Sequence, residues 1–275
     1  MASAVVYSLK ITQNRRPYSV PQRPITMDNE ELTLFRDMAH RALEAEISPH
    51  IEQWEAQHSV PRKLWHTLGQ AGLLCPDMPE EYGAAGTTPE VTFAVIEEMS
   101  RLGFGGIASG YSIHSNIVAP YIEHFGTEEQ KSQWLPKMVA GEALGALAMT
   151  EPSAGSDVQS IRTKAVKDGD EWILNGSKIF ITNGMLADIV IVAAITDPGK
   201  GAKGTSLFIV DATLPGFARG KKIEKMGQHT SDTAELFFQD VRLPASSLLG
   251  ELNKGFVIMM TELPRERLGI AAQAI

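Results

Sequence analysis

Apolar residues recur every three or four positions through the first half of the chain, and this period predicts amphipathic helices over residues 27–143. One apolar face runs from Leu32 to Ile47. Further helix starts are indicated by prolines at first-turn positions and by a Thr-x-x-Gln capping box, at Pro61, Pro89 and Thr127. The pattern therefore predicts a domain built of several short helices.

Near Gly145 the pattern changes to short apolar runs separated by turn residues, as in β-strands. Three runs are strand candidates: 189–195, 206–211 and 235–239. The dipeptides Asp168-Gly169 and Asn175-Gly176 are typical of tight hairpin turns, so we expect each of them to join two strands. Short strands with such turns predict an antiparallel β-barrel or sandwich over residues 144–250.

A helical pattern returns from Asn253, with apolar positions at Phe256, Met259 and Leu263. It continues to Ile275 without a stop signal, so we expect residues 251–275 to be the first helix of a longer helical bundle. Helices and strands are segregated along the chain rather than alternating. This order predicts an α+β fold and argues against a doubly wound nucleotide-binding sheet.

Composition narrows the classes of function. The net charge of −8 argues against a surface for nucleic acid or anionic membranes. The longest clean apolar run, 189–195, is far too short to span a bilayer. Cys75 is the single cysteine, which excludes an intrachain disulfide, and the seven histidines lack HExxH spacing. We therefore expect no metal site, no nucleic-acid partner and no membrane span.

Residues 1–26 differ from the rest of the chain, because they carry basic residues and no acidic ones. Such a leader resembles a mitochondrial presequence, although its prolines make it a poor helix. The alternative is an upstream start codon, with Met27 as the natural start. Both interpretations stay open, and in either case we expect residues 1–26 to be disordered and to lie outside the fold.

Two glycine-containing segments are candidates for ligand binding. Residues 103–106 follow a helical pattern and lack GxGxxG spacing, so they predict a helix end and a turn rather than a phosphate site. Residues 145–157 have the pattern of a strand that runs into a tight turn, with hydroxyl groups on Thr150 and Ser156 and a glycine at position 155. Composition alone leaves an ordinary capped turn and a ligand-holding turn both open for this second segment.

Residues 145–157, together with 178–184 and 226–245, resemble the acyl-CoA dehydrogenase family, with its signature segments in the right order. The resemblance implies a helical N-terminal domain, a middle β domain and, in full-length members, a C-terminal four-helix domain with assembly into a homotetramer. Most of that last domain is expected to be absent from this chain. The resemblance also implies bound FAD and an acyl-CoA substrate.

The resemblance assigns flavin contacts to seven residues: Leu147, Met149, Thr150, Ser156, Phe180, Ile181 and Thr182. Ser156 would lie between the flavin and the thioester ligand, and Thr182 would hydrogen-bond near the hydride-accepting N5. Phe180 would cover one face of the flavin. Many family members carry tryptophan at this position, and phenylalanine keeps the flat apolar cover but lacks the indole donor.

The catalytic base that the resemblance implies is Glu266, because residues 262–271 are similar to the long-chain and isovaleryl-type members. Arg267 beside it would contact the substrate. A carboxylate that removes the α-proton of a thioester needs a raised pKa, which burial near apolar surface provides. By spacing alone, Glu266 could instead be a surface carboxylate paired with Arg265 or Arg267, and Glu262 is a rival base one turn earlier.

The implied reaction is FAD-dependent α,β-dehydrogenation of an acyl-CoA thioester to the trans-2-enoyl-CoA, with electrons passed to an electron-transfer flavoprotein. Two alternatives stay open: an acyl-CoA oxidase-like enzyme that uses oxygen, and an inactive or merely ligand-binding fragment. The substrate would be medium to long or branched. The location would be cytoplasmic in a bacterium and the mitochondrial matrix in a eukaryote.

Overall fold

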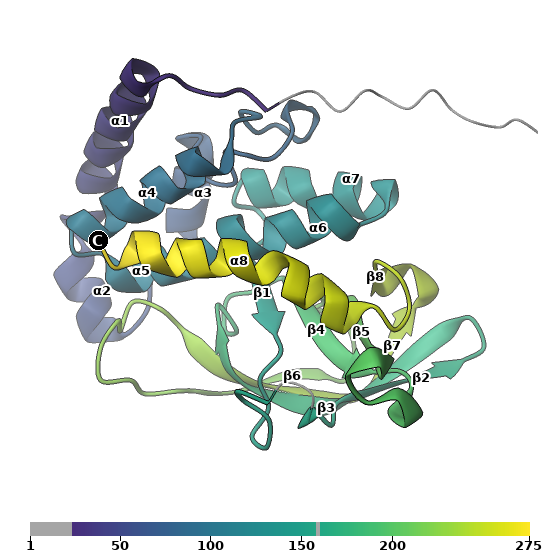
Figure 1. The fold of residues 1–275 in the computed structure, drawn as a ribbon. Helices are drawn as coiled ribbons and strands as arrows, with labels where there is room; N and C mark the ends of the chain where they lie inside the picture. The colour runs from purple at the N-terminus through teal and green to yellow at the C-terminus, as the bar shows by residue number, and fades with distance from the viewer. Residues whose placement is uncertain (1–23, 158–159) are drawn as a thin grey trace, which may run out of the picture.

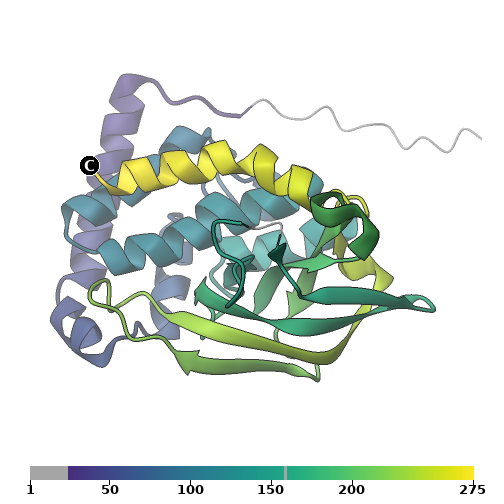
Figure 2. The same ribbon diagram turned by 60° about the horizontal axis from the view of Figure 1, so that its bottom comes forward.

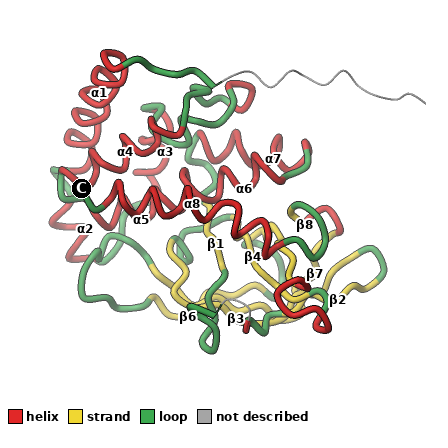
Figure 3. The backbone as a smooth tube through the Cα atoms, viewed as in Figure 1, coloured by secondary structure: helices red, strands yellow, loops and turns green. Residues whose placement is uncertain are grey.

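The computed structural model describes residues 24–157 and 160–275. A layer of helices lies on one side of a curved β-sheet (Figure 1), and the two kinds of element are segregated in space as they are in sequence (Figure 3). This arrangement confirms the predicted α+β fold. The expected leader falls mainly on residues outside the described ones, but Ile25 is described, and its N–H donates to the carbonyl of Gly86 at 2.8 Å.

The helical layer precedes the sheet in sequence. It consists of α1 (Asn29–Ile47), α2 (Ile51–Gln57), α3 (Arg62–Gln70), the short η1 (Glu80–Tyr82), α4 (Pro89–Arg101), α5 (Gly105–Tyr111), the π-helix η2 (Ser112–Val118), α6 (Ala119–Phe125) and α7 (Glu128–Val139). The predicted capping box is present, because Gln130 N–H donates to the Thr127 hydroxyl and the Gln130 side chain accepts from the Thr127 N–H. Pro89 opens α4 as predicted, and Pro61 stands at the N-cap of α3.

The glycines of residues 103–106 do end one helix and start the next. Gly103 follows the C-cap of α4 with a φ of 81°, in the left-handed region that glycine tolerates. Gly105 is the first residue of α5. This part of the chain is a turn between two helices, as the sequence predicts.

Among the described residues the sheet has eight strands, and it is mixed rather than wholly antiparallel as the sequence predicted. The strands are β1 (Gly145–Ala148), β2 (Lys164–Asp168), β3 (Glu171–Thr182), β4 (Ile189–Ile195), β5 (Thr205–Asp211), β6 (Phe217–Lys222), β7 (Thr233–Pro244) and β8 (Leu248–Leu249). The order is β6-β7-β3-β2-β4-β5-β8, with β1 beside β4. β1 and β2 pair with β4 in parallel, and the other pairings are antiparallel. The Asp168-Gly169 hairpin forms between β2 and β3 as predicted.

The predicted hairpin at Asn175-Gly176 is wrong. β3 runs straight through this dipeptide, and its register against β7 shifts between Leu174 and Gly176, which marks a β-bulge. Glycine is needed there because of packing: a Cβ on Gly176 would lie 2.4 Å from Oγ1 of Thr163. A glycine that lets two backbones approach closely has the same sequence signature as a hairpin glycine.

Two apolar clusters hold the layers together, and β4 belongs to both. Its alternate residues Ile189, Ile191 and Ala193 face the cluster shared with the helices, while those in between face a second cluster inside the β domain. That second cluster includes Trp172 and Phe208, whose rings meet edge to face. A strand buried on both faces reads as a continuous apolar run, which explains the pattern of 189–195.

The last helix, α8 (Gly255–Gln273), crosses over the molecule from the sheet to the helical layer, as the yellow ribbon of Figures 1 and 2 shows. It packs against α4 and η2 and touches β5. Its outer side exposes several large apolar side chains, including Val257, Leu268 and Ile270. Among the described residues, no helix is long and apolar enough to cross a membrane.

Candidate active site

β1 and the segment that follows it lie alongside the last part of β3, and two hydrogen bonds join the two parts of the chain. The side-chain amide of Asn183 donates to the carbonyl of Gly145 at 3.2 Å, and the N–H of Ile179 donates to the carbonyl of Thr150 at 3.0 Å. The fold therefore brings together the two stretches that carry the predicted flavin contacts, 147–150 and 180–182.

A buried ion pair reinforces this junction. Lys178 is fully buried, and its Nζ lies 2.8 Å from Oε1 of Glu151 and 2.9 Å from the carbonyl oxygen of Met149. The carboxylate of Glu151 also accepts the backbone N–H groups of residues 162 and 163. Burial lowers the pKa of Lys178 to about 8, against the opposing attraction of Glu151. Burial alone would raise the pKa of Glu151, but attraction to Lys178 and these hydrogen bonds outweigh it and lower that pKa.

Phe180 stands out on β3. Its φ of 61° lies in the left-handed region, beside a register shift between Lys178 and Ile181. A phenylalanine with positive φ is strained, and such strain persists only where the surroundings impose it. The result is an aromatic ring that is 61% exposed, in contrast to Ile181, which is buried in the β-domain cluster at 2%. The side chain of Ile181 thus packs in the core of the β domain.

The remaining predicted flavin residues differ in exposure. Thr150 and Thr182 are half-buried, and Leu147 packs into the cluster shared with the helices. Ser156 is exposed in the turn that precedes residues 158–159, which lie outside the described ones. Next to it, no atom lies within 4 Å of a Cβ built on Gly155, so the backbone of this turn is open to an approaching group.

Glu266 lies on the inner side of α8 and is only 8% exposed. The hydroxyl of the fully buried Tyr121 on α6 donates to its Oε1 at 2.8 Å. Burial raises the pKa of Glu266; the hydrogen bond from Tyr121 opposes this rise, and the charge of Glu262 adds to it. The carboxylate therefore has the environment that proton removal from a thioester requires.

The surface-pair interpretation of Glu266 does not hold. Arg265 turns away from it and binds Asp77 at 2.6 Å and the side chain of Asn116 at 3.1 Å. Arg267 is exposed on α8, and its charge lowers the pKa of Glu266 from a distance.

The rival carboxylate, Glu262, is also buried, at 5% exposure. It accepts a hydrogen bond of 2.8 Å from Nδ1 of His124 on α6, and this bond raises the pKa of His124. Glu262 and Glu266 are four residues apart on α8 and face two residues of α6 that are three apart. The environments differ: Glu262 is paired with an imidazole whose pKa is raised, whereas Glu266 accepts from a neutral hydroxyl donor.

Sequence reasoning missed Tyr121, the Glu151–Lys178 pair and the His124–Glu262 pair. Glu151 and Lys178 lie inside the family-like segments. The lysine interrupts an apolar strand pattern, and a charged residue at such a position indicates a buried ion pair. Tyr121 gives no such signal, because its role depends on a helix 145 residues further along the chain. No three His, Cys, Asp or Glu side chains of the described residues are grouped so as to hold a metal ion.

Residues 29–142 match the acyl-CoA dehydrogenase N-terminal domain, and residues 146–241 match the acyl-CoA dehydrogenase middle domain. The chain belongs to the acyl-CoA dehydrogenase family. It is 49% identical to the long-chain specific acyl-CoA dehydrogenase of rat mitochondria over 90% of this chain and 57% of the relative. The chain thus spans somewhat more than half the length of that relative.

Solved structures agree with this assignment. An acyl-CoA dehydrogenase from Geobacillus kaustophilus superposes with a TM-score of 0.87 at 47% identity, over 90% of this chain and 65% of that one. A glutaryl-CoA dehydrogenase from Mycobacterium smegmatis, solved in complex with FADH2, gives a TM-score of 0.82 at 34% identity, over 90% and 62%. The predicted family and fold are both confirmed.

Proposed function

We propose that the protein containing this chain is an FAD-dependent acyl-CoA dehydrogenase in which Glu266 is the catalytic base. The observation that carries the proposal is the buried carboxylate of Glu266, whose pKa is raised by its apolar surroundings. Arg267, the next residue on α8, is exposed and would supply a positive charge for the substrate. The names of the relatives favour a dehydrogenase over an oxygen-using oxidase or a protein that only binds the ligand.

The residues at the β1–β3 junction fit a flavin. An exposed, strained aromatic ring at Phe180 offers a flat apolar surface, and half-buried hydroxyls at Thr150 and Thr182 offer hydrogen bonds to polar ring edges. Leu147, Met149, Ser156 and the backbone of Ile181 would complete the protein side of the site. Bound FAD would supply the acceptor for the β-hydride of the substrate.

The chain's own residues perform the proton chemistry. The carboxylate of Glu266 takes the α-proton of the acyl-CoA. Burial favours this transfer, because a raised pKa makes Glu266 a stronger base than an exposed glutamate. Arg267 contributes positive charge near the same point of α8. The product of this chemistry is the trans-2-enoyl-CoA.

Membership of the family also suggests the acyl chain length, the electron acceptor and the oligomeric state of the full-length protein. The acyl chain is medium to long or branched, electrons pass to an electron-transfer flavoprotein, and the full-length protein is a homotetramer. The rat relative is named as mitochondrial and the Geobacillus protein is bacterial, so the same chemistry suits a mitochondrial matrix or a bacterial cytoplasm.

An absorbance spectrum combined with an acyl-CoA titration under nitrogen tests the proposal. The flavin bands should bleach when octanoyl- or palmitoyl-CoA is added to the wild type. Glu266→Gln should slow the bleaching at least ~100-fold while FAD stays bound, because a general base contributes about that much. Glu46→Gln, which changes an exposed carboxylate of α1, is the matched control and should bleach normally. Bleaching at the wild-type rate in Glu266→Gln would show that Glu266 is not the base.

A further inference from the structure

We propose that Tyr121 is the positioning residue of the catalytic base: its hydroxyl holds one oxygen of the Glu266 carboxylate and leaves the other free to accept the proton. This inference rests on the proposed function, and it adds a residue from α6 to a site otherwise built from α8 and the sheet. The contact that carries it is the 2.8 Å hydrogen bond between the Tyr121 hydroxyl and Oε1 of Glu266.

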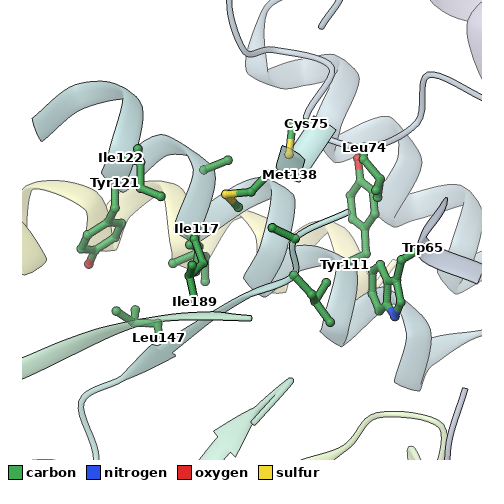
Figure 4. Close-up of a cluster of buried hydrophobic side chains, with 14 of the residues drawn as sticks. Trp65, Leu74, Cys75, Tyr111, Ile117, Tyr121, Ile122, Met138, Leu147 and Ile189 are labelled. Atoms are coloured by element: carbon green, nitrogen blue, oxygen red, sulfur yellow. The ribbon is translucent and has the colours of Figure 1, made fainter. Parts of the chain in front are cut away.

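The place of Tyr121 in the fold makes its hydroxyl rigid. The ring is fully buried in the cluster that also contains Ile117, Ile122 and Leu147 (Figure 4). In that view its hydroxyl is directed away from Ile122, at the edge of the cluster. A side chain locked by packing delivers its donor at a fixed point, which a flexible surface residue does not. Because Leu147 belongs to the same cluster, the base and the strand that leads to the flavin contacts share one rigid support.

Tyr121 is the side chain that holds the Glu266 carboxylate by a hydrogen bond. Within residues 24–157 and 160–275, the Tyr121 hydroxyl is the one side-chain donor recorded on Glu266. A neutral donor keeps the carboxylate ionisable while fixing its plane. A guanidinium in the same place would lower the pKa of Glu266 much further and weaken the base. The nearby guanidinium of Arg265 instead forms a salt bridge with Asp77.

The titratable groups around Glu266 set the direction of the expected change in its pKa. They are Glu262 and Arg267 on α8 itself, with Tyr121 facing from α6 and His124 reaching Glu262 from the same helix. Loss of the Tyr121 hydroxyl removes a group that lowers the pKa of Glu266, while Glu262 continues to raise it. Tyr121→Phe should therefore raise the pKa of Glu266.

Tyr111 provides a matched control. It is also a fully buried tyrosine, and its hydroxyl also donates at 2.8 Å, but to the backbone carbonyl of Leu73. Tyr111→Phe and Tyr121→Phe thus remove the same atom from equally buried places. A merely structural role for Tyr121 predicts similar losses of stability in the two variants and no specific change at Glu266.

The first measurement follows the side-chain carboxyl signal of Glu266 by 13C NMR over a pH series, assigned by its disappearance in Glu266→Gln. Tyr121→Phe should move the titration midpoint to higher pH, and Tyr111→Phe should leave it in place. 3-Fluorotyrosine at position 121 keeps the ring and makes the hydroxyl more acidic, so it should move the midpoint to lower pH. This second variant covers the case in which Tyr121→Phe does not fold. An unchanged midpoint in both position-121 variants would overturn the inference, whether or not the protein is a dehydrogenase.

The second measurement is the rate of flavin reduction by acyl-CoA in the full-length protein. Tyr121→Phe should slow the step about tenfold or more at neutral pH, since a hydrogen bond to a charged group is lost. Its rate should rise with pH through a higher midpoint than in the wild type, and Tyr111→Phe should follow the wild-type profile. Equal pH profiles for Tyr121→Phe and the wild type would also refute the positioning role. A wild type that is not reduced at all would contradict the proposed function instead, and the NMR titration would still decide the contact.

Discussion

The ammonium group of Lys178 lies 2.8 Å from the carboxylate of Glu151, and both side chains are buried where the segment after β1 meets β3. Glu151 directly follows the first of the two stretches that carry the proposed flavin contacts, 147–150, and Lys178 lies just before the second, 180–182. Their ion pair ties these stretches together through Nζ of Lys178, which also holds the carbonyl of Met149. The geometry of the site thus depends on a charged pair inside the protein.

Removal of one member of this pair should be costly. Lys178→Met leaves the Glu151 carboxylate buried without its cation, and we expect the free energy of unfolding to fall by about 3–5 kcal/mol. Lys178→Met combined with Glu151→Leu should lose less than Lys178→Met alone, because no unpaired charge remains. Urea unfolding followed by circular dichroism measures both. Equal losses in the single and double variants would contradict this account.

An exposed ion pair gives the control for that experiment. Arg242 lies 2.8 Å from Glu171 on the sheet, the same distance as in the buried pair, but both side chains are largely in solvent. Arg242→Gln should therefore leave the unfolding midpoint almost unchanged. The contrast isolates burial, and not the distance between charges, as the cause of the effect.

Glycine is required at the bulge in β3. A Cβ on Gly176 would lie 2.4 Å from Oγ1 and 2.7 Å from Cα of Thr163, and the second of these atoms belongs to the backbone. We expect Gly176→Ala to lower the free energy of unfolding by about 1–3 kcal/mol, because the two backbones must move apart and the φ of 152° at this position disfavours a residue with a Cβ. Gly227→Ala is the matched control, since no atom lies within 4 Å of its Cβ. Similar unfolding midpoints for the two variants would argue against the close approach.

The raised pKa of Glu266 also predicts a pH dependence of stability. The folded state binds the Glu266 proton more tightly than the unfolded state does, so this group stabilises the fold at low pH, and the contribution is lost as pH rises through the folded pKa. Glu266→Gln removes the ionisable group. Its melting temperature relative to the wild type should therefore be higher at pH 8 than at pH 5. A constant difference between the two pH values would show that the pKa of Glu266 is not raised by folding.

Local sequence signals predicted the helical part of the fold well, because capping and helix starts depend on neighbours a few residues away. The capping box at Thr127 and the proline at 89 are examples. Asn175-Gly176 was predicted wrongly, because pairing with β7, some sixty residues later, keeps β3 continuous. The sheet order and the two parallel pairings of β4 have no local signature either.

For the site, the resemblance supplied Glu266 and the flavin contacts, but the partners of the carboxylates came only from the structure. Tyr121 and His124 reach Glu266 and Glu262 across 145 and 138 residues of chain. No spacing rule links helices so far apart in sequence. The backbone strain at Phe180 could not be predicted from the sequence either, because a positive φ in an aromatic residue is imposed by the tertiary fold and not by the residue's own preference.

That strain leads to the last prediction. Phe180 adopts a φ of 61°, which costs about 1–2 kcal/mol for a residue with a side chain and little for glycine. Because its ring is 61% exposed, loss of the ring removes little packing from the protein without ligand. Phe180→Gly should therefore unfold at a urea concentration equal to or above that of the wild type, while its affinity for FAD falls.

Phe180→Trp is the opposite change to Phe180→Gly, because it keeps the backbone strain and enlarges the flat aromatic surface. It should retain FAD and show no gain in stability. FAD titration followed by flavin fluorescence, together with urea unfolding of the protein without flavin, separates the two effects. If Phe180→Gly were less stable and still bound FAD normally, the exposed ring would be serving the fold, and the strain at this position would have no connection with the flavin.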